Sequence, residues 1–168
     1  MRALLLATLL FLAACVAAPR PQAPDAAAPA FPVLRFFEGK TEGKGSLNIA
    51  FQSPGSLDVR SRGTIESDGT LVLRQVIDQS GKPARQREWR IRELSPGRYA
   101  GTLTDAEGPV KGEVSHNRLR ISFRMKGGLD AEQWLTLAPD GRSAHNAMVV
   151  RKFGFTVAAV DETIRKLD

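Results

Sequence analysis

The stretch that decides the fold is RLRISFRM, residues 118–125, in which apolar and polar side chains alternate over eight positions. Successive side chains of a β-strand point to opposite faces of the sheet, so Leu119, Ile121, Phe123 and Met125 would share one face. The arginines and the serine between them would share the other. This order predicts a strand with one face in a core and one face in water.

The same alternation recurs along the chain from residue 33 onward. Trp89 and Ile91 alternate with Arg90 and Arg92, and dipeptides suited to hairpin turns separate such runs about every 10 to 14 residues. No segment between the runs gives a convincing helix. We expect strands near residues 44–51, 56–66, 70–78, 85–94, 98–105, 109–115, 118–126, 131–138 and 143–151, and one more from about 153.

Sequential antiparallel strands leave exposed edges in a flat sheet, and closure into a barrel removes those edges. We therefore predict an all-β fold, an antiparallel up-and-down barrel of about 8–10 strands that is lipocalin-like or calycin-like. A two-sheet β-sandwich is the alternative. The chain of 168 residues has the length of one domain. The barrel domain would span residues 33–168.

The N-terminus predicts export and a lipid anchor. Arg2 precedes an apolar run with six leucines, and residues 1–14 together are typical of a secretory signal peptide too short to cross a bilayer. Leu12-Ala13-Ala14-Cys15 matches the lipobox, whose cysteine is acylated and becomes the new N-terminus. Cys15 is the only cysteine, which excludes an intrachain disulfide, so we expect it to be lipidated. Val16 in place of a retaining aspartate favours the outer membrane of a bacterial envelope, facing the periplasm.

Residues 15–32 would join this anchor to the barrel. After Cys15 the segment VAAPRPQAPDAAAPAFP holds five prolines and seven alanines and shows no apolar periodicity. Such a segment buries too little apolar surface to order itself, which predicts a tether. Fully extended at about 3 Å per residue, it could hold the domain up to roughly 50 Å from the bilayer.

Two motifs of the chain are specific, the Asp-x-x-Gly-x-x-x-Gly run that begins at Asp105 and the Lys-Phe-Gly close at residues 152–154. Through them the chain resembles a known family, the bacterial lipoproteins of domain of unknown function 3833. The resemblance covers roughly residues 36–160 and implies no assigned activity. It does imply an association with genes for fatty-acyl or membrane-lipid modification. Members of the family carry an acidic pair and a methionine near the second tryptophan, where this chain has Glu132-Gln133-Trp134-Leu135. The other matching residues are Trp89, Gly97–Thr102, Asn117 and Asn146–Phe155.

The motifs of common enzyme classes are absent. The chain has no nucleophile elbow, and its glycine-rich stretches lack the spacing of a phosphate loop or a dinucleotide fingerprint. His116 and His145 are the only histidines, so we predict no metal site and no cofactor. We place His116 in a solvated turn and keep His145 as a weaker functional candidate. Because the chain would be exported, we expect no nucleic-acid partner, although its formal net charge is +6.

Polar residues on the apolar face of the strands are the candidates for a site. Asp105 shares its phase with Tyr99 and Leu103, so its carboxylate should point inward or lie at the barrel rim and needs a partner. Arg85, Arg87 or Lys152 could supply that partner. In the functional interpretation these groups hold the polar head of a ligand in an apolar pocket. In the structural interpretation they form a rim network and the aromatic residues are core. The candidate ligand-binding residues are Trp89, Tyr99, Asp105, Phe123, Trp134, Asn146, Met148 and Lys152.

Three functions remain open at this point. The first is a non-enzymatic, membrane-anchored lipoprotein whose barrel binds or carries an apolar, fatty-acyl or lipid ligand. The second is an accessory or scaffold lipoprotein that binds an envelope protein or an anionic lipid surface through basic residues such as Arg118, Arg120 and Arg124. The third is a lipid-modifying enzyme that uses Asp105. The residues identify no catalytic group and no protein partner.

Overall fold

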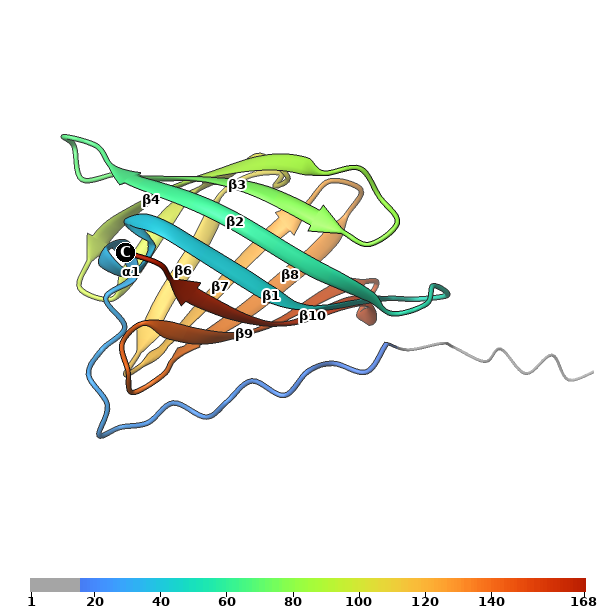
Figure 1. Ribbon diagram of the computed structural model, residues 1–168, viewed down its shortest axis with the longest axis horizontal. Helices are drawn as coiled ribbons and strands as arrows, with labels where there is room; N and C mark the ends of the chain where they lie inside the picture. Colours follow the sequence, from blue (N-terminus) through green and yellow to red (C-terminus); the bar gives the residue numbers. More distant parts are fainter. Residues whose placement is uncertain (1–15) are drawn as a thin grey trace, which may run out of the picture.

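Alternating apolar residues turn most of the chain into strands, and the strands close on themselves. The computed structural model describes residues 16–168, in which ten antiparallel strands form a closed barrel (Figure 1). Each strand pairs with its neighbours in sequence, and β10 pairs with β1, so neither edge is left open. The elements are α1 (Val33–Phe37), β1 (Gly39–Ile49), β2 (Gly55–Ile65), β3 (Leu71–Gln79), β4 (Arg85–Ser95), β5 (Arg98–Leu103), β6 (Val110–Ser115), β7 (Arg118–Met125), β8 (Leu129–Leu137), β9 (Ser143–Lys152) and β10 (Phe155–Lys166).

The barrel prediction is confirmed, and each predicted strand region holds one observed strand. The sandwich alternative is not adopted. Helix α1 precedes the first strand, occupies the first residues of the predicted domain and was not anticipated from the sequence. Five residues are too few for a helical periodicity to stand out in the sequence. The helix begins after Pro32 and buries Val33, Phe36 and Phe37, so packing against the barrel holds it in place.

Helix α1 covers one end of the barrel, which we call the closed end. Phe31, Phe36 and Phe37 pack edge to face there, with ring centroids 5.2 Å apart for Phe31 and Phe36 and 5.0 Å apart for Phe36 and Phe37. All three are buried and belong to the main apolar core. The hairpins at the opposite end are residues 50–54, 80–84, 104–109, 126–128 and 153–154.

The Ala/Pro-rich segment of residues 16–32 lies along the outer wall of the barrel. It starts where the Val16 amide donates to the Thr156 carbonyl at 3.4 Å, and the Gln22 carbonyl accepts from the Arg118 guanidinium at 3.2 Å. At the closed end the Asp25 amide donates to Asn117 Oδ1 at 2.8 Å. Its polar backbone finds partners on the wall, so extended chain is stable there without a periodic apolar face.

We call residues 16–32 the strap. It runs from the uncovered end of the barrel to the closed end, below β9 in Figure 1. Residues 1–14 and Cys15, which carry the predicted signal peptide and lipidation site, lie outside the described residues. Within residues 16–168, no helix combines the length and the apolar character that crossing a membrane requires.

Candidate functional site

The barrel encloses a cavity of about 530 Å³. Most of its lining is aliphatic or aromatic, and it extends from Val33 and Phe37 under α1 to Phe51 on the hairpin between β1 and β2. Phe51 is 88% exposed, so the cavity reaches solvent at the end opposite α1. We call this the open end. The volume lies within the range of about 300–1,000 Å³ usual for small-molecule sites.

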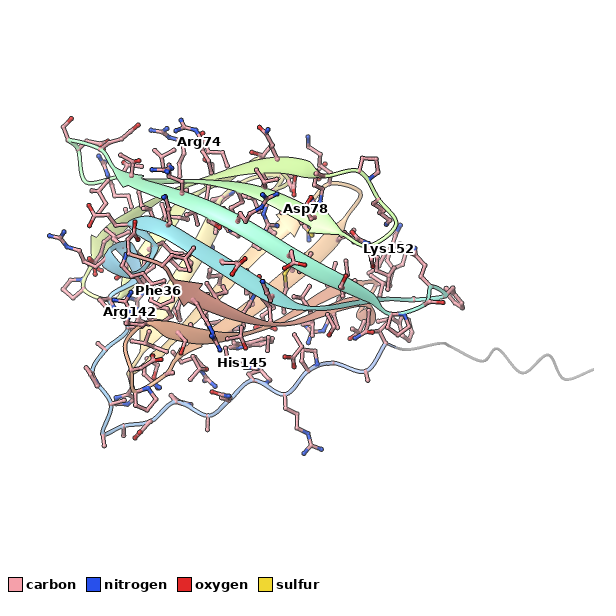
Figure 2. All side chains as sticks on the ribbon, in the orientation of Figure 1. Phe36, Arg74, Asp78, Arg142, His145 and Lys152 are labelled. Atoms are coloured by element: carbon pink, nitrogen blue, oxygen red, sulfur yellow. The ribbon has the colours of Figure 1, made fainter. Side chains whose placement is uncertain are left out.

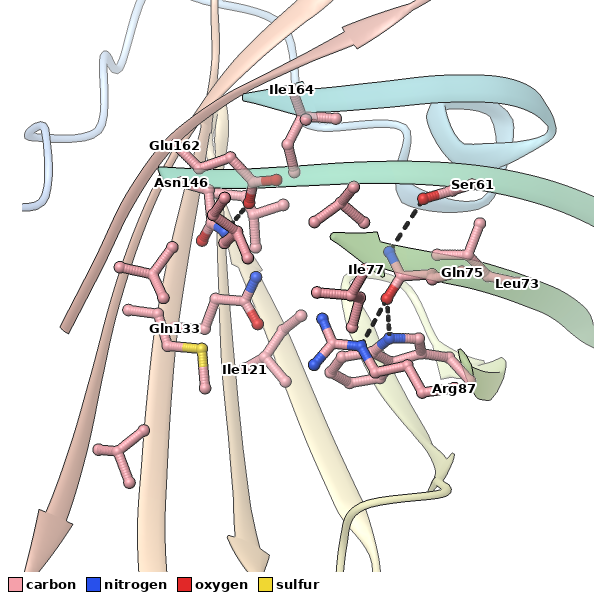
Figure 3. Close-up of a pocket in the computed structure, with 18 of the residues that line it drawn as sticks. Ser61, Leu73, Gln75, Ile77, Arg87, Ile121, Gln133, Asn146, Glu162 and Ile164 are labelled. Carbon is pink, nitrogen blue, oxygen red and sulfur yellow. Dashed lines mark hydrogen bonds between the residues drawn. The ribbon is translucent and has the colours of Figure 1, made fainter. Parts of the chain in front are cut away.

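One wall of the cavity carries a hydrogen-bonded polar group on three adjacent strands. Ser61, Gln75 and Arg87 are in register across β2, β3 and β4, and all three point inward (Figure 3). Gln75 Oε1 accepts from Arg87 Nε and from Trp89 Nε1, each at 2.8 Å, and Gln75 Nε2 donates to Ser61 Oγ at 3.0 Å. The network fixes Arg87 and Trp89 in place. We call Ser61, Gln75, Arg87 and Trp89 the arginine wall.

Arg87 brings a positive charge into this apolar space. Burial, with the nearby charge of Arg85, lowers the pKa of Arg87 to about 10, so the guanidinium stays protonated at neutral pH. Its carbon Cζ lies 5.3 Å from the centre of the Trp89 ring, where the ring face stabilises a cation. Only its Nε has an acceptor among the described residues. The two terminal nitrogens therefore have N–H donors to offer a ligand.

The opposite wall holds a carboxyl and two amides. Glu162 of β10 and Asn146 of β9 face each other in register, and Asn146 Nδ2 donates to Glu162 Oε2 at 2.8 Å. Gln133 of β8 lies beside them (Figure 3). Burial raises the pKa of Glu162, while the Asn146 hydrogen bond and the charge of Arg87 lower it. We call Gln133, Asn146 and Glu162 the amide wall.

The amide wall has two acceptor oxygens without partners among the described residues, and a glycine leaves room for its carboxyl group. Gln133 Oε1 and Asn146 Oδ1 are buried and have no partner among residues 16–168. A buried acceptor without a partner costs free energy, which a ligand donor would recover. Gly43 on β1 makes room for the carboxyl group, because a Cβ there would lie 1.8 Å from Glu162 Oε1. The chain thus keeps a glycine where this charged side chain needs volume.

The structure brings four of the predicted ligand residues into the cavity lining. Trp89, Tyr99, Asn146 and Met148 line it, with Tyr99 near the closed end. Burial raises the pKa of Tyr99 to about 12, with a further contribution from Glu93. Phe123 lies one layer behind the lining, edge-on to Trp89 with ring centroids 5.5 Å apart.

Asp105 lies at the barrel rim, one of the two positions predicted for it. Its Oδ2 accepts from Arg85 Nη1 at 2.8 Å, at the open end. Arg85 is therefore its partner, rather than Arg87 or Lys152. The side chain of Arg85 is half exposed, so this ion pair is a surface contact of modest strength.

Besides Phe123 and Asp105, Trp134 and Lys152 do not line the cavity. Trp134 alternates with Gln133 and Leu135, which point inward, so its ring lies on the outer face of β8. An aromatic residue in a strand favours neither face of the sheet by itself. The inward positions of its neighbours therefore place Trp134 on the outer face. Lys152 has the inward phase of Met148, but it is the last residue of β9 and extends into solvent at the open end (Figure 2).

Two of the three arginines on the outer face of β7 form ion pairs with β8. Arg120 forms an ion pair with Glu132 of β8, and Arg124 Nε lies 3.2 Å from Asp130 Oδ1. Arg118 donates to the neutral carbonyl of Gln22 in the strap and keeps its charge. The charges of Arg120 and Arg124 are therefore balanced by acidic neighbours, and that of Arg118 is not.

The two histidines lie outside the cavity. His116 is exposed in the turn between β6 and β7 with φ of 53°, so its predicted turn position is confirmed. His145 is on the outer wall, 3.1 Å from Asp161 Oδ1. Among residues 16–168 no group of three His, Cys, Asp or Glu side chains is arranged to hold a metal ion.

Sequence reasoning missed most of the polar residues inside the barrel. Gln75, Gln133 and Glu162 each interrupt an inward apolar series, as Glu162 does between Val160 and Ile164. That interruption is the signal that could have found them. It is visible only when the phase of each strand is fixed, because a single polar residue also occurs where a strand ends.

A model of the family described as "Protein of unknown function (DUF3833)" matches residues 9–166. The chain belongs to this family. The match confirms the resemblance identified from the residues around Asp105 and the Lys-Phe-Gly close. A search of curated proteins found no relative of this chain.

Solved structures give the DUF3833 barrel its context. It is similar to the S-type phycobiliprotein lyase CpeS from Guillardia theta, with a TM-score of 0.65 and 5% identity over 81% of this chain and 91% of the lyase. It is also similar to a protein of unknown function from the DUF3598 family of Nostoc punctiforme PCC 73102, with a TM-score of 0.63 and 11% identity. That match covers 83% of this chain and 50% of the other, so this chain spans about half its length. At these identities the likeness shows a shared lipocalin-like fold.

Proposed function

We propose that this DUF3833 protein is a membrane-anchored binding protein that carries an apolar ligand with an acidic head group, such as a fatty acid. The observation that carries the proposal is Arg87, a protonated guanidinium with free N–H donors inside an apolar cavity. Isolated buried charges are costly, so such a group is stabilised when an anion binds it. A carboxylate provides that anion, and an acyl chain fills the aliphatic remainder of the cavity.

The two walls would bind different groups of the ligand. The arginine wall holds a charged group, because Gln75 fixes one edge of the guanidinium and leaves the other edge free. The amide wall would accept a hydroxyl or amide donor through Gln133 Oε1 and Asn146 Oδ1. A hydroxylated or amide-bearing fatty acid would use both walls at once. A purely hydrocarbon ligand would leave both without partners.

The anchor belongs to the same proposal. Lipidation of Cys15 would hold the protein at a bacterial envelope membrane, where acyl ligands are available. The cavity and the phycobiliprotein lyase likeness support a barrel that takes up a small molecule. The scaffold alternative is weakened because Arg120 and Arg124, two of its three arginines, already pair with acidic residues of β8.

The experiment compares binding of a C16 fatty acid with binding of the matched C16 alcohol by titration calorimetry. The parent protein should prefer the acid. Arg87→Met keeps an apolar side chain of similar length and should lose about 1.5–3 kcal/mol of acid affinity, roughly a ten- to hundredfold weakening. Its affinity for the alcohol should change little.

Arg90→Met is the matched control, because Arg90 lies on the outer face of the same strand and pairs with Glu66 at 2.6 Å. It should bind both probes as the parent does. Equal binding of acid and alcohol by the parent would remove Arg87 from recognition. Absence of any acyl compound in lipid extracts of the purified protein, together with no binding of either probe, would refute the proposal.

A further inference from the structure

Three phenylalanines are exposed together at the open end. Phe51, Phe153 and Phe155 are 88%, 87% and 61% exposed. Their hairpins are neighbours, since β1 pairs with β10 and the Ala50 amide donates to the Val157 carbonyl at 2.9 Å. We call these three residues the aromatic lip. Exposed aromatic side chains on neighbouring hairpins mark a surface that meets an apolar partner.

The backbone of the lip is held in a conformation that disfavours phenylalanine. Phe51 and Phe153 have φ of 62° and 51°, in the left-handed region that large side chains rarely adopt. Phe153 and Gly154 form the two-residue turn of a hairpin, with φ of 51° and 84°, where asparagine would be preferred to phenylalanine at the first position. Folding therefore does not account for an aromatic residue at this tip.

The two hairpin segments that carry the lip together contain basic residues and no acidic residue. Residues 49–57 and 150–160, which contain the lip, include two basic residues and no acidic one. Arg151 pairs with Glu132, whereas the Lys152 ammonium lies over the Phe153 ring, 5.7 Å from its centre, and is exposed. Exposed aromatic rings next to a free lysine match the interface of a bilayer that contains anionic lipids.

The strap begins at the open end, beside the aromatic lip. Val16, whose amide bonds to the Thr156 carbonyl, lies beside Phe155 and follows directly after Cys15 in the sequence. An acyl group on Cys15 would therefore be attached one residue before this contact with the Thr156 carbonyl. The strap contacts the wall at both ends of the barrel, so it would hold the domain against the bilayer.

We propose that the open end docks face-on to an anionic bilayer, with Phe51, Phe153 and Phe155 inserted among the lipid head groups and the cavity mouth opening onto the membrane. The use of this orientation for loading an acyl ligand rests on the proposed function. The docking itself stands on the lip, Lys152 and the position of Val16. The ligand would then pass between bilayer and cavity without crossing water.

The test measures the depth of single residues in the membrane. The full chain is expressed with its own leader, purified from membranes and reconstituted in nanodiscs of phosphatidylethanolamine and phosphatidylglycerol with brominated acyl chains. Phe51→Trp and Phe153→Trp each place an indole in the lip. Leu94→Trp is the matched control, because Leu94 is 67% exposed but lies near the end of β4 at the closed end.

The added tryptophan fluorescence of Phe51→Trp and Phe153→Trp should be quenched by the bromolipid at least twofold more than that of Leu94→Trp. Hydrogen exchange in the parent should slow at residues 50–54 and 153–155 on reconstitution, and not at 94–97. Equal quenching at both ends would overturn the proposal. So would slowed exchange without quenching, which would indicate a protein partner.

If the chain is recovered without an acyl group, the anchor has failed and docking is tested by itself. The same variants are then mixed with vesicles of the same composition, and absence of lip quenching would overturn docking. Lip quenching together with no binding of the C16 fatty acid would preserve docking and refute the proposed ligand. The two proposals are therefore separated by different readouts.

Discussion

The two ends of the barrel use the same residue type in opposite ways. At the closed end Phe31, Phe36 and Phe37 are buried against one another and against the core. At the open end the aromatic lip is exposed beside a cavity mouth. Figure 2 marks the contrast with Phe36 at one end and Lys152 at the other. Apolar character alone thus does not decide burial; one set of rings stabilises the fold and the other remains available to a partner.

The largest effect is expected from breaking the closed end. Phe36→Ala removes a buried ring from the centre of the aromatic cluster and should lower the free energy of unfolding by about 3–5 kcal/mol. Phe51→Ala removes an exposed ring at the open end and should change the free energy of unfolding by no more than about 0.5 kcal/mol. Urea unfolding with an unchanged slope measures both. Similar losses of unfolding free energy at the two ends would contradict the claim that only the closed-end rings stabilise the fold.

A smaller and pH-dependent effect is expected inside the cavity. Since burial raises the pKa of Glu162, the folded protein binds more protons than the unfolded chain between the unfolded and folded pKa values. This group therefore stabilises the fold less as pH rises through that interval. Glu162→Gln removes the cost of burying an ionised carboxylate, so the free energy of unfolding of this variant should exceed the parent's at neutral pH. The excess should vanish at a pH below 4.5, the usual pKa of this carboxyl.

Glu113→Gln provides the control for the cavity carboxyl. Glu113 is exposed on the outer face of β6, 3.7 Å from Arg98, and such surface pairs contribute little to stability. Its urea midpoint should follow the parent's at every pH. A Glu162→Gln variant that is less stable than the parent at pH 7 would contradict the desolvation cost assigned to this carboxyl.

The smallest effect is expected at the tip of the aromatic lip. Phe153→Asn places the preferred residue in the left-handed position and should raise the free energy of unfolding by about 0.5–1 kcal/mol. The same variant should weaken membrane docking. A thermal melt and a vesicle sedimentation assay on one sample would measure both. Lower stability would show that the ring contributes to the fold after all.

The sequence predicted the barrel well because its information is local. Alternation in residues 118–125 and in the other strands, with turn residues between them, determines each strand and its buried face. Closure follows from the need to remove edges. The helix α1 was missed because its stability comes from packing on the closed end. The contacts of the strap were missed because extended backbone that bonds to a wall leaves no periodic pattern.

The candidate site was predictable only in part. Trp89, Tyr99, Asn146 and Met148 were found from their phase, and Asp105 was found at the rim. The pairing of Gln75 with Arg87 across two strands depends on register, which single-strand patterns do not contain. Trp134 was misplaced for a related reason, since its size favoured the cavity while the alternation of β8 directs it outward.

The central claim is that the cavity behind the open end binds an acyl chain. The two tryptophans of the chain, one inside the cavity and one outside, allow a direct measurement. In Trp134→Phe the remaining Trp89 lines the cavity, whereas in Trp89→Phe the remaining Trp134 lies on the outer face of β8. Each variant is titrated with a dibrominated C18 fatty acid while tryptophan fluorescence is recorded. Saturable quenching of Trp89 at one ligand per chain, with Trp134 unaffected, is the predicted result. Unchanged Trp89 fluorescence, or equal quenching in both variants, would contradict the account.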